Sequence, residues 1–375
     1  MSHLFESAKI GTMSLANRFV RSATWEGLAT VDGAVTPELV KAIEELARGG
    51  VGLIISSHAY VRPDGQAGPR QLGAHKDELV PGLRRMATAA RENGAKMVLQ
   101  LAHAGCFAAE ELTGTTPLAV SAALESDDPP GREVSATGIR DLVRAFADAA
   151  RRAKAAGFDG VQIHAAHGYL LSQFLSPRFN RRADAYGGDI LQRSRASVEV
   201  IAAVREVLGQ EAPLLVKMNC RDWAEGGLEP DDAIQAAVLL QEAGADAIEI
   251  SSGLPRFSKF TAVRSGIDAE EKEAYHQEEA KAFKQRLKVP LILVGGIRSY
   301  AVAERLVKGG VCDFISMSRP FIREPGLVNR WKSGDRQPAA CTSDNLCFGP
   351  IRKGDGFYCV TADKEKSRSM GRPET

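Results

Sequence analysis

The sequence predicts an α/β protein built as a (β/α)8 barrel, the TIM-barrel class. Eight short runs rich in valine, isoleucine and leucine alternate with seven longer segments rich in alanine, glutamate and arginine. Strand-like and helix-like segments that alternate in this way are typical of a parallel sheet with helical crossovers. An open doubly wound sheet is the structural alternative, but no G-x-G-x-x-G motif follows the first strand run.

The predicted elements follow one another in a regular order. Strands are expected at residues 18–23, 51–57, 96–102, 159–165, 213–219, 246–252, 290–296 and 313–319. Helices are expected between them, at residues 36–50, 77–94, 139–158, 192–209, 229–245, 269–288 and 299–310. Several of these begin on a capping residue or proline and end on glycine, as helices do. Such a barrel typically takes ~250 residues, so the chain has room for long loops, which the spacing places after strands three, four and six.

Composition and charge are those of an ordinary globular protein and give no indication of a nucleic-acid or membrane partner. The net charge is +1, and no apolar run approaches the ~18 residues of a membrane span. The first residues contain no apolar core of a signal peptide, so we expect a cytoplasmic protein. Six cysteines in this length do not indicate a disulfide scaffold. We expect a small-molecule substrate, and the sequence leaves open whether the protein is a homo-oligomer.

The chain is expected to divide into a barrel and a short extension. The barrel is predicted over residues 1–335, and a cysteine-containing extension over residues 336–375. From residue 360 the extension is polar, and its composition predicts a disordered tail.

Polar residues at the ends of the strand runs form the candidate site, because barrel enzymes build their sites at the carboxyl ends of the strands. In chain order these residues are Ser22, Ala23, Thr24 and Trp25; Ser57 and His58; Gln100 and His103; His164, His167 and Tyr169; Lys217 and Asn219; Ser251 and Ser252; Gly295 and Gly296; and Ser318 and Arg319. Gly295, Gly296 and Arg319 could bind a phosphate, since small residues let backbone amides approach an anion and arginine adds a charged fork. The alternative is that the two glycines form only a tight turn.

His164, His167 and Tyr169 fall within six residues. Two histidines at this spacing could bind zinc, but zinc needs at least a third protein ligand. No carboxylate or thiol lies close to them in the sequence, so we predict no metal here.

The stretch IHAAHGYLLSQFLSP, followed by NRRADAYGG, resembles the signature of the old yellow enzyme family. The similarity continues through NRFVRSA, LQLAHAG, LVKMN, VGGI and SRPFIREP and covers roughly residues 3 to 330. It is strongest to the branch that includes thermophilic-type members and dienoyl-CoA reductases. The resemblance implies a flavin-dependent ene-reductase: NADH or NADPH reduces FMN, and the flavin passes hydride to the β-carbon of an α,β-unsaturated carbonyl compound.

The resemblance also implies roles for individual residues. His164 and His167 would donate hydrogen bonds to the substrate carbonyl oxygen, where enolate charge develops. Tyr169, a phenol with an ordinary pKa near ~10, would contact the substrate and protonate its α-carbon. Gln100 would face the flavin pyrimidine and Lys217 its N1 and O2 edge. The remaining cofactor contacts would come from Ser22, Ala23, Thr24 and Ser57, and the phosphate contacts from Gly295, Gly296, Ser318 and Arg319.

Two departures from the family pattern stand out. Where the thermophilic-type branch has a cysteine and a substrate-contacting tyrosine, this sequence has Trp25 and Gly27. Trp25 is expected either to line the substrate site or to pack under a loop.

The second departure is near the C-terminus, where four cysteines of dienoyl-CoA reductase-like members carry a [4Fe-4S] cluster. Here Cys341, Cys347 and Cys359 remain, and Asp344 stands near the position of the missing one. A carboxylate is a poorer ligand for this iron, so we expect free thiols, with an iron–sulfur site as the weaker alternative. The further domains of those relatives find no room in this sequence, so we expect FMN to be reduced directly.

Other functions remain as alternatives. Related flavin barrels oxidise N-methyl groups, so an oxidative demethylase of a methylated amine is the main alternative; Tyr169 favours the ene-reductase, because demethylation needs no phenolic proton donor. A flavin-binding or ligand-binding barrel without turnover is a third possibility. An isomerase or aldolase barrel is a more distant alternative, because it would require a Schiff-base lysine or a carboxylate base in place of the histidines.

Overall fold

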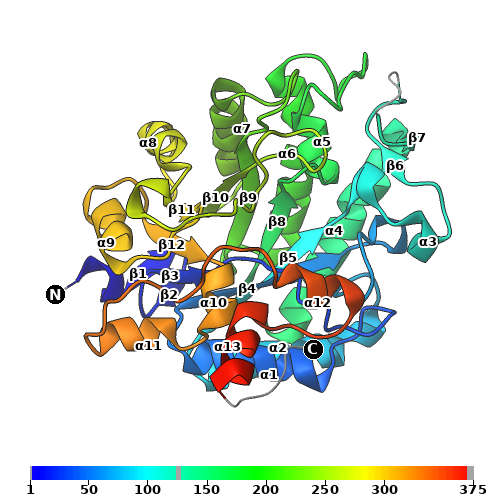
Figure 1. Cartoon of the computed structure of the whole chain (residues 1–375). Coiled ribbons are helices and arrows are strands. Elements are labelled where there is room, and N and C mark those ends of the chain that lie inside the picture. Colours follow the sequence, from blue (N-terminus) through cyan, green and yellow to red (C-terminus); the bar gives the residue numbers. More distant parts are fainter. Residues whose placement is uncertain (1, 124–127, 370–375) are drawn as a thin grey trace.

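The computed structural model describes residues 2–123 and 128–369 and is a closed barrel of eight parallel strands (Figure 1). In chain order the strands are β3 (Phe19–Arg21), β4 (Leu53–Tyr60), β5 (Lys96–Ala102), β8 (Gly160–Ala165), β9 (Leu214–Arg221), β10 (Ala247–Ser252), β11 (Leu291–Val294) and β12 (Phe314–Met317). β12 pairs with β3 and closes the barrel, with Ser316 opposite Val20. The predicted fold is confirmed, each predicted strand run forms a strand, and the open sheet is excluded.

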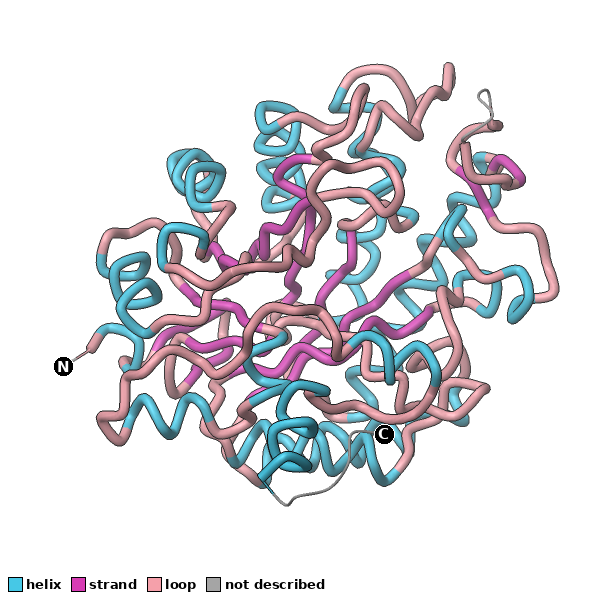
Figure 2. Tube along the Cα trace, viewed as in Figure 1, coloured by secondary structure: helices cyan, strands magenta, loops and turns pink. Residues whose placement is uncertain are grey.

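Seven helices predicted from the sequence surround these strands (Figure 2). They are α1 (Pro37–Arg48), α2 (Val80–Glu92), α4 (Ala136–Ala156), α6 (Ile190–Leu208), α7 (Pro230–Glu242), α8 (Gln277–Arg286) and α9 (Tyr300–Lys308). The capping signals act as expected: the side chains of Thr36, Ser135 and Asp189 each accept a backbone N–H in the first turn of a helix. Gly157 ends α4 in the left-handed conformation at φ 83°.

The helix predicted over residues 269–288 is much shorter in the structure. Only Gln277–Arg286 is α-helical, preceded by a 3-10 turn at Glu270–Lys272. Ala274 has a φ of 49°, which interrupts the helix. The interruption directs Glu273 toward α9, where its carboxylate accepts the backbone N–H groups of Arg298 and Ser299 at 2.8 and 2.9 Å. A tertiary contact therefore overrides the helical pattern.

An N-terminal hairpin that the sequence pattern did not predict covers one end of the barrel. It consists of β1 (Ala8–Ile10) and β2 (Met13–Leu15), which pair antiparallel. Ile10, Met13 and Leu15 are buried and pack with inward-facing strand residues such as Val20 and Phe314. The hairpin thus completes the core inside the barrel at the end away from the candidate site.

The long loops occur after β5, β8 and β10, the third, fourth and sixth barrel strands, as predicted. The first contains α3 (Glu110–Thr113), β6 (Leu118–Ala119) and β7 (Arg132–Glu133), and the second contains α5 (Leu170–Leu175). After β12 come α10 (Arg319–Arg323), α11 (Leu327–Lys332), α12 (Phe348–Lys353) and α13 (Val360–Ser369). Where we expected a disordered tail from residue 360, α13 forms and Arg323 pairs with Glu365; residues 370–375 lie outside the described part. None of the described helices is long and apolar enough to cross a membrane.

Candidate active site

A cavity of about 420 Å³ opens where the barrel strands end. Most of the side chains predicted from strand ends line it: Ser22, Ala23, Thr24, Trp25, Gln100, His164, His167, Tyr169, Lys217 and Ser318. A smaller cavity of about 50 Å³ is lined by Gly296, Ser318 and Arg319, and it shares Ser318, Val294 and the 262–263 segment with the large one. Of the predicted cofactor residues, Ser57 and Gly295 line neither cavity.

The two histidines and the tyrosine form one cluster on the cavity wall. The His164 ring is edge-on to Tyr169 and to His167, with centroids 4.9 and 5.2 Å apart. His167 has a left-handed φ of 57°, and its backbone N–H donates to Asn219 Oδ1 at 3.0 Å. Its Nε2 lies 2.7 Å from Ser251 Oγ. β8 carries His164, and the turn that follows it directs His167 and Tyr169 into the same space.

The surroundings keep these groups uncharged. Burial lowers the pKa of both His164 and His167 well below the usual range, and the positive charge of Lys217 lowers it further. Burial raises the pKa of Tyr169. Near neutral pH the cavity therefore presents two neutral imidazoles and a protonated phenol. His164 Nδ1 is buried and has no hydrogen-bond partner among the described residues, so a bound molecule can contact it.

A buried polar network forms the floor of the cavity, and sequence reasoning found only part of it. The Lys217 ammonium donates to Ser22 Oγ at 2.7 Å and to Glu249 at 3.1 Å. The Glu249 carboxylate also accepts hydrogen bonds from Ser22, Ser316 and Gln162. Gln100 joins the network by donating to Gln162 at 2.7 Å. Glu249 and Gln162 lie mid-strand within apolar runs, and an unpaired carboxylate in a buried strand was the signal that could have identified Glu249.

His58, on β4, also lines the cavity, and sequence reasoning gave it no role. Its Nε2 lies 3.3 Å from the Tyr169 hydroxyl, and the two rings meet edge to face with centroids 5.5 Å apart. Burial lowers the pKa of His58 to about 4. The site therefore contains a third neutral imidazole beside the phenol.

Known proteins match this chain over nearly all of the barrel. Residues 3–337 match the NADH:flavin oxidoreductase / NADH oxidase family. An NADH oxidase of Thermoanaerobacter brockii is 34% identical over 354 residues, 92% of this chain and 54% of that protein. An NADPH dehydrogenase of Bacillus subtilis (strain 168) is 35% identical over 323 residues, 86% of this chain and 92% of that protein. The chain belongs to the old yellow enzyme family.

A solved structure of similar shape is that of 2-naphthoyl-CoA reductase in complex with 2-naphthoyl-CoA. It superposes with a TM-score of 0.89 at 27% identity, over 95% of this chain and 56% of that one. The chain thus spans about half the length of this reductase and of the NADH oxidase. As a member of the family, the chain contains a barrel of the NADH:flavin oxidoreductase type.

The two adjoining cavities of this old yellow enzyme barrel fit FMN. The larger is wide enough for a planar ring system and is bordered by buried polar groups, including Gln100 and Lys217. The smaller offers Arg319 and the backbone of Gly296, which has a φ of 73°. A Cβ at Gly296 would lie 2.8 Å from the Tyr275 ring, so both the backbone conformation and the space require glycine there.

The departures at Trp25 and Gly27 shape the mouth of the cavity. Trp25 lines the cavity, with its ring against Gly68, so it belongs to the site rather than to a distant loop contact. A Cβ on Gly27, whose φ is 63°, would lie 3.0 Å from the backbone oxygen of Ile351 in α12. α12, at the red end of the chain in Figure 1, brings Phe348 and Arg352 to the cavity. The missing tyrosine therefore makes room for the extension.

The C-terminal cysteines do not present the donor set of a four-thiolate cluster. Both oxygens of Asp344 are engaged: Thr342 and Thr361 donate to Oδ2 at 2.8 and 2.5 Å, and the backbone N–H of Leu346 donates to Oδ1. Burial raises the pKa of the Cys341 thiol, and it raises that of Cys347 to about 11. The carboxylate is thus held by its neighbours in the loop and on α13, so these residues lack the free fourth ligand of a [4Fe-4S] cluster.

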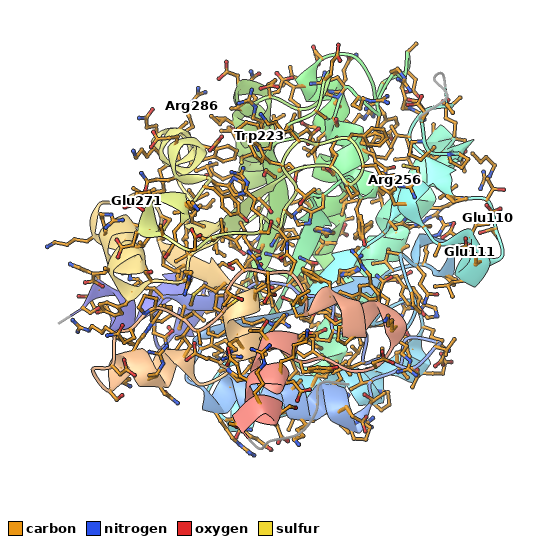
Figure 3. All side chains as sticks on the ribbon, in the orientation of Figure 1. Glu110, Glu111, Trp223, Arg256, Glu271 and Arg286 are labelled. Atoms are coloured by element: carbon orange, nitrogen blue, oxygen red, sulfur yellow. The ribbon has the colours of Figure 1, made fainter. Side chains whose placement is uncertain are left out.

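A separate group of possible metal ligands lies outside the cavities. Donor atoms of Cys220, His276 and Glu279 lie within 4.8 Å of one another. The positive charge of Arg264 acts on all three. This guanidinium stacks on rings of the loops that follow β9 and β10, including Trp223, which Figure 3 labels. A cation would meet that charge, so we assign no metal to this group.

Proposed function

We propose that this barrel is an FMN-dependent ene-reductase that reduces the carbon–carbon double bond of an α,β-unsaturated carbonyl compound. The observation that carries the proposal is the gathering of His164, His167 and Tyr169, all uncharged, around one cavity. Neutral hydrogen-bond donors and a protonated phenol suit a reaction in which an oxyanion forms and a carbon is protonated.

FMN would be held across both cavities. Gln100 and Lys217 would contact its ring, together with the chain segment from Ser22 to Thr24 that lines the same cavity. Gly296, Ser318 and Arg319 would hold its phosphate. When bound and reduced by NADH or NADPH, FMN supplies the hydride that adds to the substrate β-carbon.

The protein side chains would do the remaining chemistry. As the hydride adds, negative charge builds on the carbonyl oxygen, and His164 and His167 would stabilise it by donating hydrogen bonds. Since His167 Nε2 is already within hydrogen-bond distance of Ser251, the partner-free Nδ1 of His164 is the more available group. The Tyr169 hydroxyl would give its proton to the α-carbon, so the product carries one hydride and one proton more than the substrate.

The charge of the cavity favours this reaction over oxidation of a methylated amine. Among the described residues that line the cavity there is no aspartate or glutamate, whereas Lys217 and Arg352 are both present. Lys217 is paired with Glu249 in the floor, so Arg352 supplies the uncompensated charge. A cationic amine would meet this positive charge without a carboxylate on the wall. A neutral or anionic carbonyl compound fits the same wall, and acyl thioesters such as the ligand of 2-naphthoyl-CoA reductase are one such class.

The proposal is tested by separating the two half-reactions under anaerobic conditions. The FMN-loaded protein is reduced with NADH or NADPH, and flavin reoxidation is then followed after mixing with cyclohexenone, an unsaturated CoA thioester or a methylamine. We expect reoxidation by at least one unsaturated carbonyl compound, with the saturated product identified by mass spectrometry. Reduction of the oxidised flavin by a methylamine, with no turnover of any enone or thioester, would instead establish the demethylase.

A further inference from the structure

His58 reaches the cavity because strand β4 is irregular at its carboxyl end. The pairing between β4 and β5 shifts between Ile55 and His58, after which His58 lies opposite Gln100. A bulge of this kind re-aims the side chains that follow it. Here it places the imidazole on the cavity wall, facing the turn that carries Tyr169.

Tyr169 depends on His58 for its hydrogen bonding. In the described part of the chain, His58 Nε2 at 3.3 Å is the one hydrogen-bond partner of the Tyr169 hydroxyl. His164 touches the same phenol only through its ring, at a centroid distance of 4.9 Å. Because His58 is neutral, one of its ring nitrogens is a donor and the other an acceptor.

We propose that His58 is the proton-relay partner of Tyr169: its Nε2–H stabilises the phenolate as it forms and then replaces the lost proton. This inference rests on the proposed ene-reduction, in which Tyr169 gives up its proton once per turnover. In the relay, the Tyr169 O–H bond breaks as the substrate α-carbon gains a proton. The His58 Nε2–H bond then breaks as the phenolate oxygen is protonated, and in the same step His58 Nδ1 gains a proton, so the imidazole stays neutral throughout. The Nδ1 proton comes from water, and the hydroxide left behind is neutralised by bulk solvent, so the net proton comes from solvent. The imidazole ends as its other neutral tautomer, and proton exchange with solvent restores the Nε2–H form before the next turnover.

The position of His58 suits this task better than that of either other histidine. In the proposed reaction His164 and His167 would serve the carbonyl oxygen, and His167 Nε2 is within hydrogen-bond distance of Ser251. His58 is partly exposed along the cavity, and its Nδ1 makes no hydrogen bond within the described residues, so solvent can reach it. A phenolate buried here is a strong base, because burial raises the pKa of Tyr169. Its reprotonation through a neighbouring N–H is favourable when the other ring nitrogen gains a proton from solvent in the same step.

Three substitutions separate the hydrogen bond from the shape of the ring. His58→Gln keeps a side-chain N–H donor, His58→Phe keeps a ring without one, and His58→Ala removes both. Flavin reduction by NAD(P)H and flavin reoxidation by an enone are measured separately by stopped-flow absorbance. We expect His58→Phe and His58→Ala to slow reoxidation about tenfold, which corresponds to one hydrogen bond of about 1.4 kcal/mol. His58→Gln should slow it less, and flavin reduction should change little in all three.

The same substitutions in a Tyr169→Phe background test whether the effect passes through the phenol. With the hydroxyl absent, His58→Ala should cause no further slowing of reoxidation. His75→Gln is a matched control, since His75 stacks on Tyr60 and lies outside the cavity lining. The relay is wrong if His58→Ala slows both half-reactions equally, or slows reoxidation further in the Tyr169→Phe protein. Wild-type protein that reduces no enone or thioester would contradict the proposed function itself, a result distinct from either.

Discussion

Tyr169 is held in a setting that keeps its proton until a strong acceptor forms. Burial raises its pKa, and the three neighbouring imidazoles are neutral, so none of them promotes early ionisation of the phenol. The carbanion-like α-carbon of an enolate can take this proton, whereas water at neutral pH cannot. At the scale of one residue, the proposed ene-reduction would therefore couple proton release to hydride arrival.

Tyr169→Phe removes the proton and leaves the ring. We expect enone-dependent reoxidation of the flavin to slow by roughly 10²-fold or more, the usual contribution of a general acid. Flavin reduction by NAD(P)H should stay near the wild-type rate, because that step uses no proton from Tyr169. Stopped-flow absorbance measures both rates, and equal slowing of the two would indicate a positioning role for the hydroxyl.

Glu249 links the cavity floor to the stability of the fold. Burial alone would raise the pKa of its carboxyl, but Lys217 and the hydrogen bonds from Ser22, Gln162 and Ser316 bring the pKa below its ordinary value. A carboxyl with a lowered folded-state pKa stabilises the fold above its ordinary pKa of about 4.3. That contribution is lost as the pH falls through the folded-state value.

We therefore predict that Glu249→Gln destabilises the protein at neutral pH and flattens its loss of stability in acid. Leaving Lys217 buried without its counter-charge should lower the free energy of unfolding by about 3–5 kcal/mol. Urea unfolding at a series of pH values measures both effects. Glu229→Gln is the control: its pair with Arg221 is half-exposed, so its loss should cost only about 0–1 kcal/mol. Equal effects of the two substitutions would contradict the assigned role of Glu249.

At the scale of elements, the strand ends form the floor and walls of the site, and one C-terminal helix covers its mouth. β4, β5, β8, β9, β10 and β12 supply the polar floor and walls, and α12 covers the mouth with Phe348 and Arg352. Arg352 is exposed and has no ion-pair partner among the described residues. An anionic group on a substrate or on the nicotinamide cofactor is the natural partner for such a guanidinium.

Arg352→Ala should raise the KM for an enone that carries a carboxylate about tenfold and should leave the KM for a neutral enone nearly unchanged, since one charge-assisted hydrogen bond of about 1.5 kcal/mol is lost. Lys353→Ala, on the same helix but outside the cavity lining, is the matched control. The Kd for NADH and NADPH in flavin reduction tells the two anions apart. A weaker Kd for the cofactor with an unchanged KM for the acid would assign Arg352 to the cofactor instead.

At the scale of the whole molecule, periodic patterns predicted the barrel, and long-range contacts decided the rest. The alternation of strand and helix runs located all eight strands, and the strand-end rule brought together most of the cavity residues. What it could not locate depends on side chains that meet only in the folded chain. In the sequence Glu249 stands within an apolar run, and its role becomes visible only in the folded chain, where Lys217 lies beside it. The strand-end rule did place His58 in the site, but its contact with Tyr169 depends on a bulge that the sequence pattern does not show. Ala274 likewise leaves the helical conformation so that Glu273 can reach α9.

The cofactor content of the whole chain follows from the same geometry. We predict one non-covalent FMN per chain, released by heat and identified by mass spectrometry, since both cavities are formed by a single barrel.

We also predict iron and acid-labile sulfide far below stoichiometric amounts in protein purified without oxygen, since the oxygens of Asp344 are engaged by Thr342, Thr361 and Leu346. Asp344→Cys supplies the fourth thiolate and is the positive control: a cluster in that variant alone would show that the three cysteines are correctly spaced. Near-stoichiometric iron and sulfide in the wild type, lost on Cys347→Ser, would contradict the prediction and give this flavin barrel its own electron relay.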